Sequence, residues 1–232
     1  MAKKRKPIRN QINLAQLRRI DPLTTNQHDT FKKYDNGSNL VLHGYAGTGK
    51  SFISMYLALE EILDAASPFN KIIIIRSVVP SRDMGFLPGS IKEKIRIYEE
   101  PYKEIVDDLF GRGDGWDILK MKHLVEFTTT SYLRGLTFNN NIVIVDEIQN
   151  MCWGELDTVM TRMGENSRVI FSGDFRQTDL NSIDRKGLSK FINITKKMDN
   201  FDYIEFDKKD IVRSGIVKDY IIKKAQYADA QV

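Results

Sequence analysis

The chain alternates short runs rich in valine and isoleucine with longer stretches whose apolar residues recur at helical spacing, starting at Asn39. This alternation is typical of a parallel sheet whose strands are joined by crossover helices. Most of the short runs are apolar on successive residues, as expected when helices cover both faces of the sheet. We therefore expect an α/β fold of three layers, α/β/α, around a mostly parallel central sheet. The predicted strands are Asn39–His43, Lys71–Arg76, Leu124–Thr129, Asn141–Asp146, Ser167–Gly173 and Asp202–Phe206. The predicted helices are Thr25–Tyr34, Lys50–Ala66, Gly89–Phe110, Cys152–Met163, Lys186–Lys196 and Ile216–Tyr227.

Positive charge is concentrated at the amino terminus. Residues 1–20 contain seven lysines and arginines and no acidic residue, although the whole chain of 232 residues has 35 basic and 31 acidic side chains. The rest of the chain is therefore slightly acidic. We interpret residues 1–20 as a basic tail, partly disordered, and residues 21–232 as a single domain. Such a tail either contacts the phosphates of a nucleic acid or is simply a solvated terminus, and composition leaves both readings open.

The composition argues against several other classes of protein. The longest aliphatic runs, Ile72 to Ile75 and Ile142 to Val145, are far shorter than the roughly 20 residues of a membrane helix. No uninterrupted apolar stretch of a secretory signal follows the basic start, so we expect a cytoplasmic protein with no membrane partner. Cys152 is the single cysteine, which excludes an internal disulfide. The three histidines show no metal-ligand spacing, so a zinc site is not expected.

Residues Gly44 to Ser51 read GYAGTGKS and match the pattern GxxxxGKS between a predicted strand and a predicted helix. In such a loop the glycines let backbone N–H groups face phosphate oxygens, and the following helix adds the positive end of its dipole. We predict that Lys50 reaches the β and γ phosphates of ATP and that Ser51 offers its hydroxyl to Mg²⁺. The predicted nucleotide-binding residues of this segment are Gly44, Tyr45, Ala46, Gly47, Thr48, Gly49, Lys50, Ser51 and Phe52.

A second motif, NIVIVDEIQN, is a hydrophobic strand that ends in two adjacent carboxylates. Asp146 is placed to hold Mg²⁺, and Glu147 is placed to orient or deprotonate an attacking water. Two acids after a strand also cap helices, and it is the pairing with the GKS segment that favours nucleotide hydrolysis.

Two further segments are ambiguous on local grounds. SGDFRQ, at the end of another apolar strand, would let Gln177 sense the γ-phosphate, yet Gly-Asp is a common turn pair. Gln27 lies about one helix before the phosphate loop and would read an adenine base through its amide. Its ordinary alternative is a polar residue in the first turn of a helix capped by Thr25 or Asn26.

The helical stretch from Gly89 to Phe110 carries an apolar and aromatic stripe that includes Tyr98 and Tyr102. Its regular spacing favours a core or interface position, with stacking of bases on the tyrosines as the alternative. Pro101 predicts a kink or a break into two helices. Residues 77–89 and the GRGDG segment at 111–115 are predicted loops.

Several segments in order resemble the PhoH family of ATPases: GYAGTGKS, RSVVPSRDMGFLPGS, SYLRGLTF, IVIVDEIQN, LDTVMTRMGENSRVIFSGDFRQTDL and DIVRSGIVKDYI. The resemblance runs from about Thr24 to Tyr220. It implies a RecA-like P-loop NTPase core similar to the first domain of superfamily 1 helicases, ATP hydrolysis, ring-shaped oligomers and a link to RNA. It also implies the nucleotide roles of Gln27 and Gln177. The sequence departs from the family pattern at Tyr45, Pro80 and Arg82, and it contains no nuclease-like or appended RNA-binding module, so we expect the ATPase core alone.

We therefore expect a Mg²⁺-dependent ATP hydrolase, helicase-like, that couples hydrolysis to RNA or single-stranded DNA. The alternatives are a nucleotide-gated ring-forming scaffold and a small-molecule kinase, against which Glu147 argues. Transfer of a phosphoryl group usually needs an arginine, and no arginine has an obvious role next to the three nucleotide segments. We predict a homo-oligomer, a hexameric ring on the strength of the resemblance, in which Arg213 or else Arg162 acts on the neighbouring subunit's nucleotide.

Overall fold

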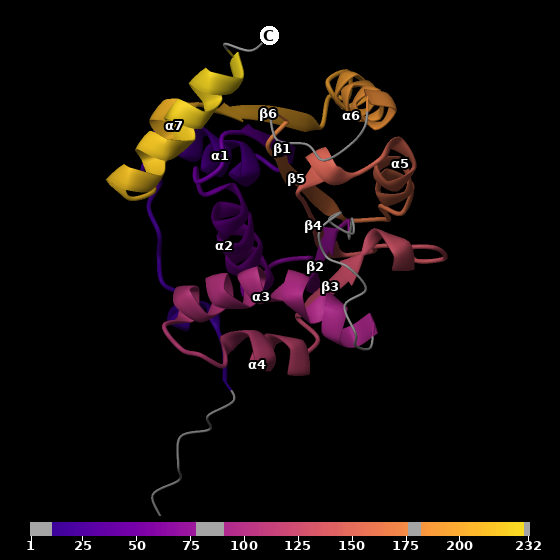
Figure 1. Cartoon of the computed structure of the whole chain (residues 1–232). Coiled ribbons are helices and arrows are strands. Elements are labelled where there is room, and N and C mark those ends of the chain that lie inside the picture. Colours follow the sequence, from indigo (N-terminus) through magenta and orange to yellow (C-terminus); the bar gives the residue numbers. More distant parts are fainter. Residues whose placement is uncertain (1–10, 78–90, 176–181, 230–232) are drawn as a thin grey trace, which may run out of the picture.

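A six-stranded, wholly parallel sheet forms the centre of the molecule in a computed structural model that describes residues 11–77, 91–175 and 182–229 (Figure 1). The strand order is β3-β2-β4-β5-β1-β6. The strands are β1 (Asn39–Gly44), β2 (Lys71–Arg76), β3 (Val125–Thr129), β4 (Asn141–Asp146), β5 (Arg168–Gly173) and β6 (Phe201–Phe206). All six predicted strands are confirmed, with ends within one residue of the prediction. Because every strand is parallel, their carboxyl ends share one edge of the sheet.

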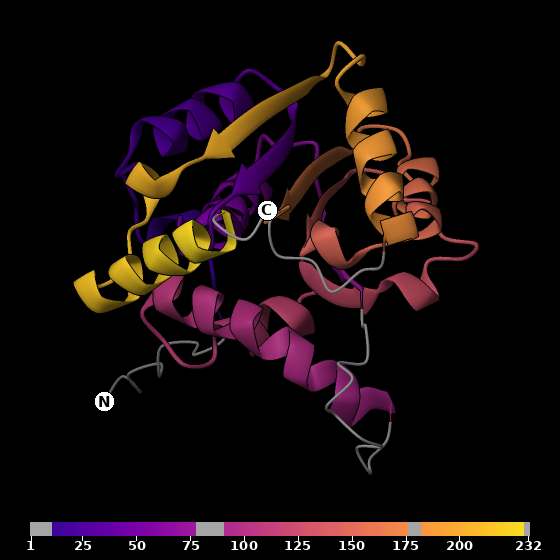
Figure 2. The same ribbon diagram turned by 45° about the horizontal axis from the view of Figure 1, so that its top comes forward.

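Helices cover both faces of this sheet. The helices are α1 (Thr25–Asp35), α2 (Lys50–Ile62), α3 (Ile91–Phe110), α4 (Gly115–Met121), α5 (Trp153–Thr161), α6 (Ser182–Thr195) and α7 (Gly215–Asp229). Short 3₁₀ turns lie at Leu14–Gln16, Thr130–Tyr132, Ile148–Asn150 and Lys208–Asp210. Helices α1 to α4 lie on one side of the sheet, and α5 and α6 lie on the other (Figures 1 and 2).

Alternate residues of each inner strand enter two separate hydrophobic cores. In β2, Ile72 and Ile74 join the core under α1 to α4, whereas Ile73 and Ile75 join the core under α5 and α6. The same alternation occurs in β4. This two-sided burial explains why the strands are apolar on successive residues, and it confirms the expected three-layer α/β/α arrangement.

Three helical predictions need correction. The chain from Gly115 to Met121 forms α4, which the sequence analysis did not predict. Helix α3 runs unbroken through Pro101, so of the predicted alternatives, a kink or a break into two helices, the break is wrong. Helix α2 ends at Ile62 and not at Ala66, because the chain turns through Asp64 and Ser67 before β2. Among the described residues, no helix is long and apolar enough to cross a membrane.

Candidate functional site

The GYAGTGKS segment connects the carboxyl end of β1 to the first residue of α2. Gly44, Gly47 and Gly49 all have positive φ angles, 121°, 74° and 87°, which side chains other than glycine rarely adopt. Gly44 is also confined by its neighbour strand, because a methyl group built on it would lie 2.0 Å from the Phe206 carbonyl oxygen. The backbone of this loop therefore requires glycine at these positions.

Lys50, the first residue of α2, is buried inside this loop with an exposed fraction of 9%. Its ammonium donates to the carbonyl oxygens of Gly44, at 2.9 Å, and Tyr45, at 2.7 Å. Burial lowers the pKa of Lys50, and the nearby carboxylates, Asp174 first among them, oppose that shift. A cation held by the loop in this way is available to an anionic group that enters beside it.

The Asp146 carboxylate, at the end of β4, accepts four hydrogen bonds. One oxygen, Oδ2, accepts the Ser51 hydroxyl at 2.9 Å and the Tyr102 hydroxyl at 2.9 Å. The other, Oδ1, accepts the Ser172 hydroxyl and the Glu147 backbone N–H. The direct contact between Ser51 and Asp146 brings together the two residues that the sequence analysis assigned to a metal, as that assignment requires.

The chemistry of this donor set fits Mg²⁺, which prefers oxygen ligands and retains several waters. In the described part of the chain, at this site or any other, no group of three or more histidine, cysteine or acidic side chains converges to hold a metal ion. A magnesium ion at Ser51 and Asp146 would therefore take its remaining ligands from water and from the phosphates of a nucleotide.

Glu147 follows Asp146 with φ at 57°, a left-handed conformation that is uncommon outside glycine. Burial raises the pKa of the Glu147 carboxyl, and the adjacent Asp146 carboxylate adds to the shift. The Gln149 amide donates to Glu147 Oε2, and the other end of the same amide accepts the Asp174 backbone N–H at 3.1 Å. The carboxylate is thus held by a side chain that is itself anchored on the loop after β5, and it is suited to accept a proton.

Two cavities meet at the loop. The first has a volume of about 520 Å³ and lies between the loop, the carboxyl ends of β4 and β5, and helix α3, which contributes Pro101, Glu104, Ile105 and Asp108. The second, of about 480 Å³, is lined mainly by apolar side chains from the amino-terminal segment, α1 and α2. Gly47, Gly49, Phe52 and Arg213 line both. The first cavity has room for a charged or polar group, and the second has room for a flat, apolar group beside it.

Gln27 lies at the second cavity and is buried, with an exposed fraction of 4%. Its amide oxygen accepts the Leu23 N–H at 2.7 Å, and its amide nitrogen donates to the Thr48 carbonyl at 3.0 Å. Gln27 therefore ties α1 to the phosphate loop, and base recognition by its amide stays a prediction. The residue that caps α1 is Thr24, not Thr25 or Asn26, because the helix already begins at Thr25 and the Thr24 side chain accepts the Gln27 N–H.

Arg213 also lies at the cavities of its own chain. After β6 the chain turns at Lys208–Asp210 and returns over the phosphate loop, where the Val212 N–H donates to the Gly47 carbonyl at 3.0 Å. A methyl group built on Gly47 would lie 2.8 Å from Arg213 Cγ. The sequence analysis expected no arginine beside the nucleotide segments of its own chain, and the structure has Arg213 among the residues that line both cavities. No partner chain is present to test the predicted action of Arg213 on a neighbouring subunit.

Arg162 lies elsewhere. It follows α5, and its carbonyl accepts the N–H of Phe138, which precedes β4, at 2.8 Å. This is the amino edge of the parallel sheet, opposite the cavities. Gln177, Pro80 and Arg82 lie outside the described residues, whereas Asp174 is buried and lines the first cavity.

Sequence reasoning missed three residues that the structure brings to Asp146 and Glu147: Tyr102, Ser172 and Gln149. Ser172 and Gln149 follow from the rule that side chains after neighbouring parallel strands share one edge, once β4 and β5 are known to be adjacent. Tyr102 has no such signal. Its spacing predicted a core position, which its exposed fraction of 1% confirms, and that burial rules out stacking of a base on its ring.

The family profile and the similar proteins that match this chain all carry the same family description. The sequence profile described as "PhoH-like protein" matches residues 19–225. A PhoH-like protein from Mycobacterium leprae is 30% identical over 221 residues, which cover 94% of this chain and 62% of that protein. A PhoH-like protein from Bacillus subtilis is 33% identical over 175 residues, covering 75% and 54%. Protein PhoH from Escherichia coli is 35% identical over 175 residues, covering 75% and 49%. The chain thus spans about half to three fifths of each of these relatives.

Among solved structures, the similar chains are more distant. The Pif1 helicase of Bacteroides in complex with ADP-AlF4 has a TM-score of 0.45 at 18% identity, covering 84% of this chain and 44% of that one. The large terminase of bacteriophage HK97 has a TM-score of 0.48 at 16% identity, covering 81% and 39%.

Proposed function

The chain belongs to the PhoH-like protein family, and from that premise we propose that it is a Mg²⁺-dependent ATP hydrolase. The observation that carries the proposal is the 2.9 Å hydrogen bond between Ser51 and Asp146, residues 95 positions apart. Through this bond the Ser51 hydroxyl, which follows Lys50 in the chain, contacts the Asp146 carboxylate at the end of β4. The buried Lys50 lines the same cavity as these two residues. A nucleotide with its phosphates in the first cavity and its base in the second accounts for both cavities.

Each group of residues in the site would have one role in hydrolysis. Backbone N–H groups of the loop and the Lys50 ammonium bind the phosphates and neutralise their charge. Ser51 and Asp146 would hold Mg²⁺, which when bound neutralises phosphate charge and orients the phosphates. Glu147 orients a water and takes its proton, a task that suits a carboxyl whose pKa is raised by burial. Arg213, which lines the same cavity, would neutralise further charge.

We propose RNA or single-stranded DNA as the partner whose binding is coupled to hydrolysis. The basic tail of residues 1–20 supports this proposal, because lysine and arginine near phosphates release counterions. Tyr132, with an exposed fraction of 50%, and the exposed Arg134 follow β3 at the carboxyl edge of the sheet. An exposed aromatic ring beside a cation suits stacking on single-stranded bases.

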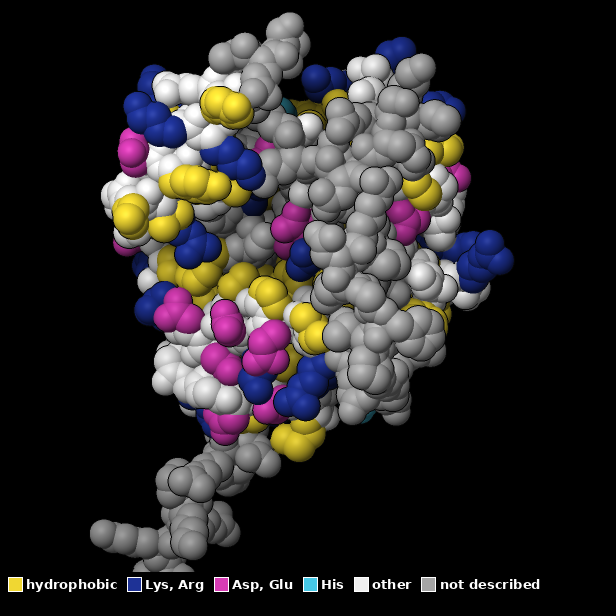
Figure 3. All heavy atoms as spheres, viewed as in Figure 1, with side chains coloured by type: hydrophobic (Ala, Val, Ile, Leu, Met, Phe, Trp, Pro, Cys, Tyr) yellow, Lys and Arg dark blue, Asp and Glu magenta, His cyan; other side chains and the backbone are white. Residues whose placement is uncertain are grey.

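We also propose a homo-oligomer, with a hexameric ring as the form that the family resemblance suggests. Helix α7 supports association, because Ile216, Tyr220 and Tyr227 are 82%, 67% and 69% exposed on it. Figure 3 shows hydrophobic side chains gathered over this helix. Exposed apolar clusters of this kind mark interaction surfaces.

The test is phosphate release from ATP with Mg²⁺ and no acceptor, measured with and without added RNA. We expect release without an acceptor, an increase when RNA is added, and loss of release in Lys50→Ala, since the phosphates then lack their main side-chain cation. Lys71→Ala is the control, because that lysine pairs with Glu126 far from the loop, at the start of β2. A requirement for a small-molecule acceptor would favour the kinase alternative. Binding of ATP without turnover would favour the scaffold.

A further inference from the structure

Tyr102 is the one α3 side chain that reaches the predicted metal ligands among the described residues. Its hydroxyl donates to Asp146 Oδ2 at 2.9 Å, the oxygen that also accepts the Ser51 hydroxyl. Its ring packs on Phe127 of β3, with centroids 5.6 Å apart and planes inclined by 35°. The hydroxyl is therefore aimed at the carboxylate by packing on the sheet.

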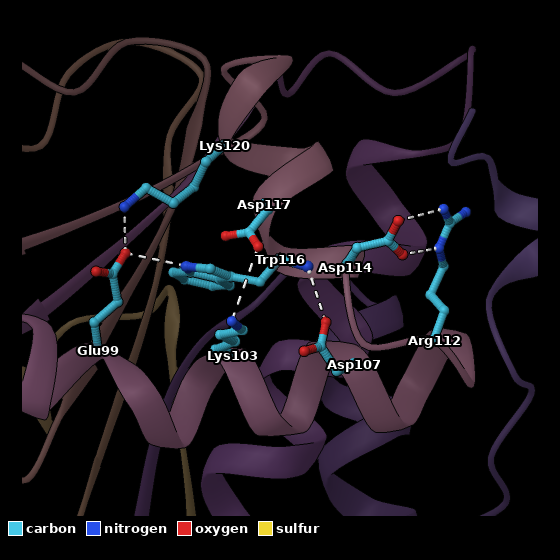
Figure 4. Close-up of polar contacts among 8 residues, drawn as sticks. All are labelled: Glu99, Lys103, Asp107, Arg112, Asp114, Trp116, Asp117 and Lys120. Atoms are coloured by element: carbon cyan, nitrogen blue, oxygen red, sulfur yellow. Dashed lines mark hydrogen bonds and ion pairs between the residues drawn. The ribbon is translucent and has the colours of Figure 1, made fainter. Parts of the chain in front are cut away.

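The helix that carries Tyr102 is fixed by a set of polar contacts to α4, which we call the α3–α4 clasp: Glu99, Lys103 and Asp107 of α3 with Trp116, Asp117 and Lys120 of α4 (Figure 4). Glu99 accepts the Trp116 indole N–H at 3.1 Å and pairs with Lys120. Asp107 accepts the Trp116 backbone N–H at 3.1 Å. Trp116 is itself buried in the core with an exposed fraction of 2%. The clasp and the core therefore hold α3 over the carboxyl edge on both sides of Tyr102.

The two hydroxyls that donate to Asp146 Oδ2 would have different roles with Mg²⁺ bound. Ser51 is itself an assigned magnesium ligand, so its hydroxyl cannot serve only to fix the carboxylate. Tyr102 has no role as a ligand in that assignment, and it lies on the side of Asp146 that faces α3. It is thus the donor that can keep Oδ2 in place with or without the metal.

We propose that Tyr102 is a positioning residue, which holds the Asp146 carboxylate in the orientation that Mg²⁺ requires and thereby links α3 to the nucleotide cavity. This proposal rests on the proposed function. Partners of metal-ligating groups typically change metal affinity by 10- to 100-fold when they are removed. The neighbours of Tyr102 on α3, Pro101 and Ile105, line the first cavity, so the same helix contacts the nucleotide space directly.

The experiment compares Tyr102→Phe with the parent chain by thermal melting in the presence of ADP. Without Mg²⁺, in a chelator, we expect ADP to stabilise both proteins equally. As Mg²⁺ is added, we expect the concentration that gives half of the further stabilisation to rise by about tenfold in the variant. Phosphate release should show the same shift in its magnesium requirement and recover at saturating Mg²⁺. A merely structural role for the hydroxyl would lower every melting temperature without moving the magnesium midpoint.

Tyr56→Phe is the matched control, because Tyr56 is also buried and its hydroxyl also donates to a carboxylate at 2.9 Å, but that carboxylate, Glu60, is exposed and is not a predicted magnesium ligand. Should Tyr102→Phe not fold, Tyr102→Met removes the same hydroxyl and fills the space with a flexible side chain. An unchanged magnesium midpoint in a folded Tyr102 variant, or an equal shift in Tyr56→Phe, overturns the proposal. If the parent itself gains no stability from Mg²⁺ with ADP, the proposed function fails instead.

Discussion

The Glu147 side chain combines a strained backbone, a buried carboxyl and a carboxylate neighbour at one position. A left-handed conformation outside glycine and a buried charge each cost free energy and persist where the surrounding structure holds them. Here β4 fixes the backbone on one side, and the Gln149 amide holds the carboxylate on the other. Such a combination is found mostly where a residue has a chemical task.

Glu147→Gln should retain nucleotide binding and slow turnover by about 10²-fold or more, the usual size of a lost general base. The amide has nearly the same shape as the carboxyl and leaves Ser51 and Asp146 untouched, but it cannot take a proton from water. Nucleotide affinity is measured by calorimetry and turnover by phosphate release. Loss of both together would show that Glu147 serves the structure of the site, contrary to the prediction.

The same substitution should stabilise the protein at neutral pH. A carboxyl whose pKa is raised in the folded state binds a proton more tightly there than in the unfolded chain, so its ionised form opposes folding. We expect Glu147→Gln to melt at a higher temperature than the parent at pH 7.5. The advantage should shrink as pH falls through the raised pKa, and vanish below the unfolded value of about 4.3. A melting difference that is independent of pH between 4 and 8 would contradict this prediction.

At the scale of elements, the strands and the site on them were predictable because their signals are local. Two-sided burial makes a strand apolar on successive residues, and the GKS and DE segments follow strands directly. Helix α4 was missed because its seven residues are too few for a helical period to show, and its stability comes from Trp116 and the clasp. Helix α3 continues through Pro101 for a similar reason, since packing of Tyr102 and Val106 in the core outweighs the lost backbone hydrogen bond. The contact of Tyr102 with Asp146 joins residues 44 positions apart, and no local pattern encodes it.

The close approach of β1 and β6 gives a prediction at this scale. Gly44→Ala should lower the free energy of unfolding by about 2 kcal/mol or more, since the new methyl group meets the Phe206 carbonyl and the φ angle of 121° disfavours alanine. Gly154→Ala is the control within α5, where a methyl group meets no atom within 4 Å, and it should leave stability unchanged or raise it by up to about 1 kcal/mol. Urea denaturation measures both. Equal effects of the two substitutions would mean that β6 yields to accommodate the methyl group.

At the scale of the whole molecule, the two candidate arginines lie at opposite edges of the sheet. Arg213 lies at the carboxyl edge, beside the cavities of its own chain. Arg162 lies at the amino edge, and its Nε is buried with no hydrogen-bond partner among the described residues. An arginine at the amino edge cannot reach a nucleotide in its own chain. In a head-to-tail ring, Arg162 would be the one to approach a neighbour's site.

Mixing inactive variants tests this assignment. We expect Lys50→Ala and Arg213→Ala, each inactive alone, to stay inactive after they are mixed and reassembled. If Lys50 and Arg213 both serve the site of their own chain, every site in the mixture lacks one of the two. Lys50→Ala mixed with Arg162→Ala should regain part of the phosphate release, since some interfaces then pair an intact Lys50 with an intact Arg162 from the next subunit. Native mass measurements must show mixed oligomers in both cases. Recovery with Arg213→Ala and none with Arg162→Ala would reverse the assignment and make Arg213 the residue that acts between subunits.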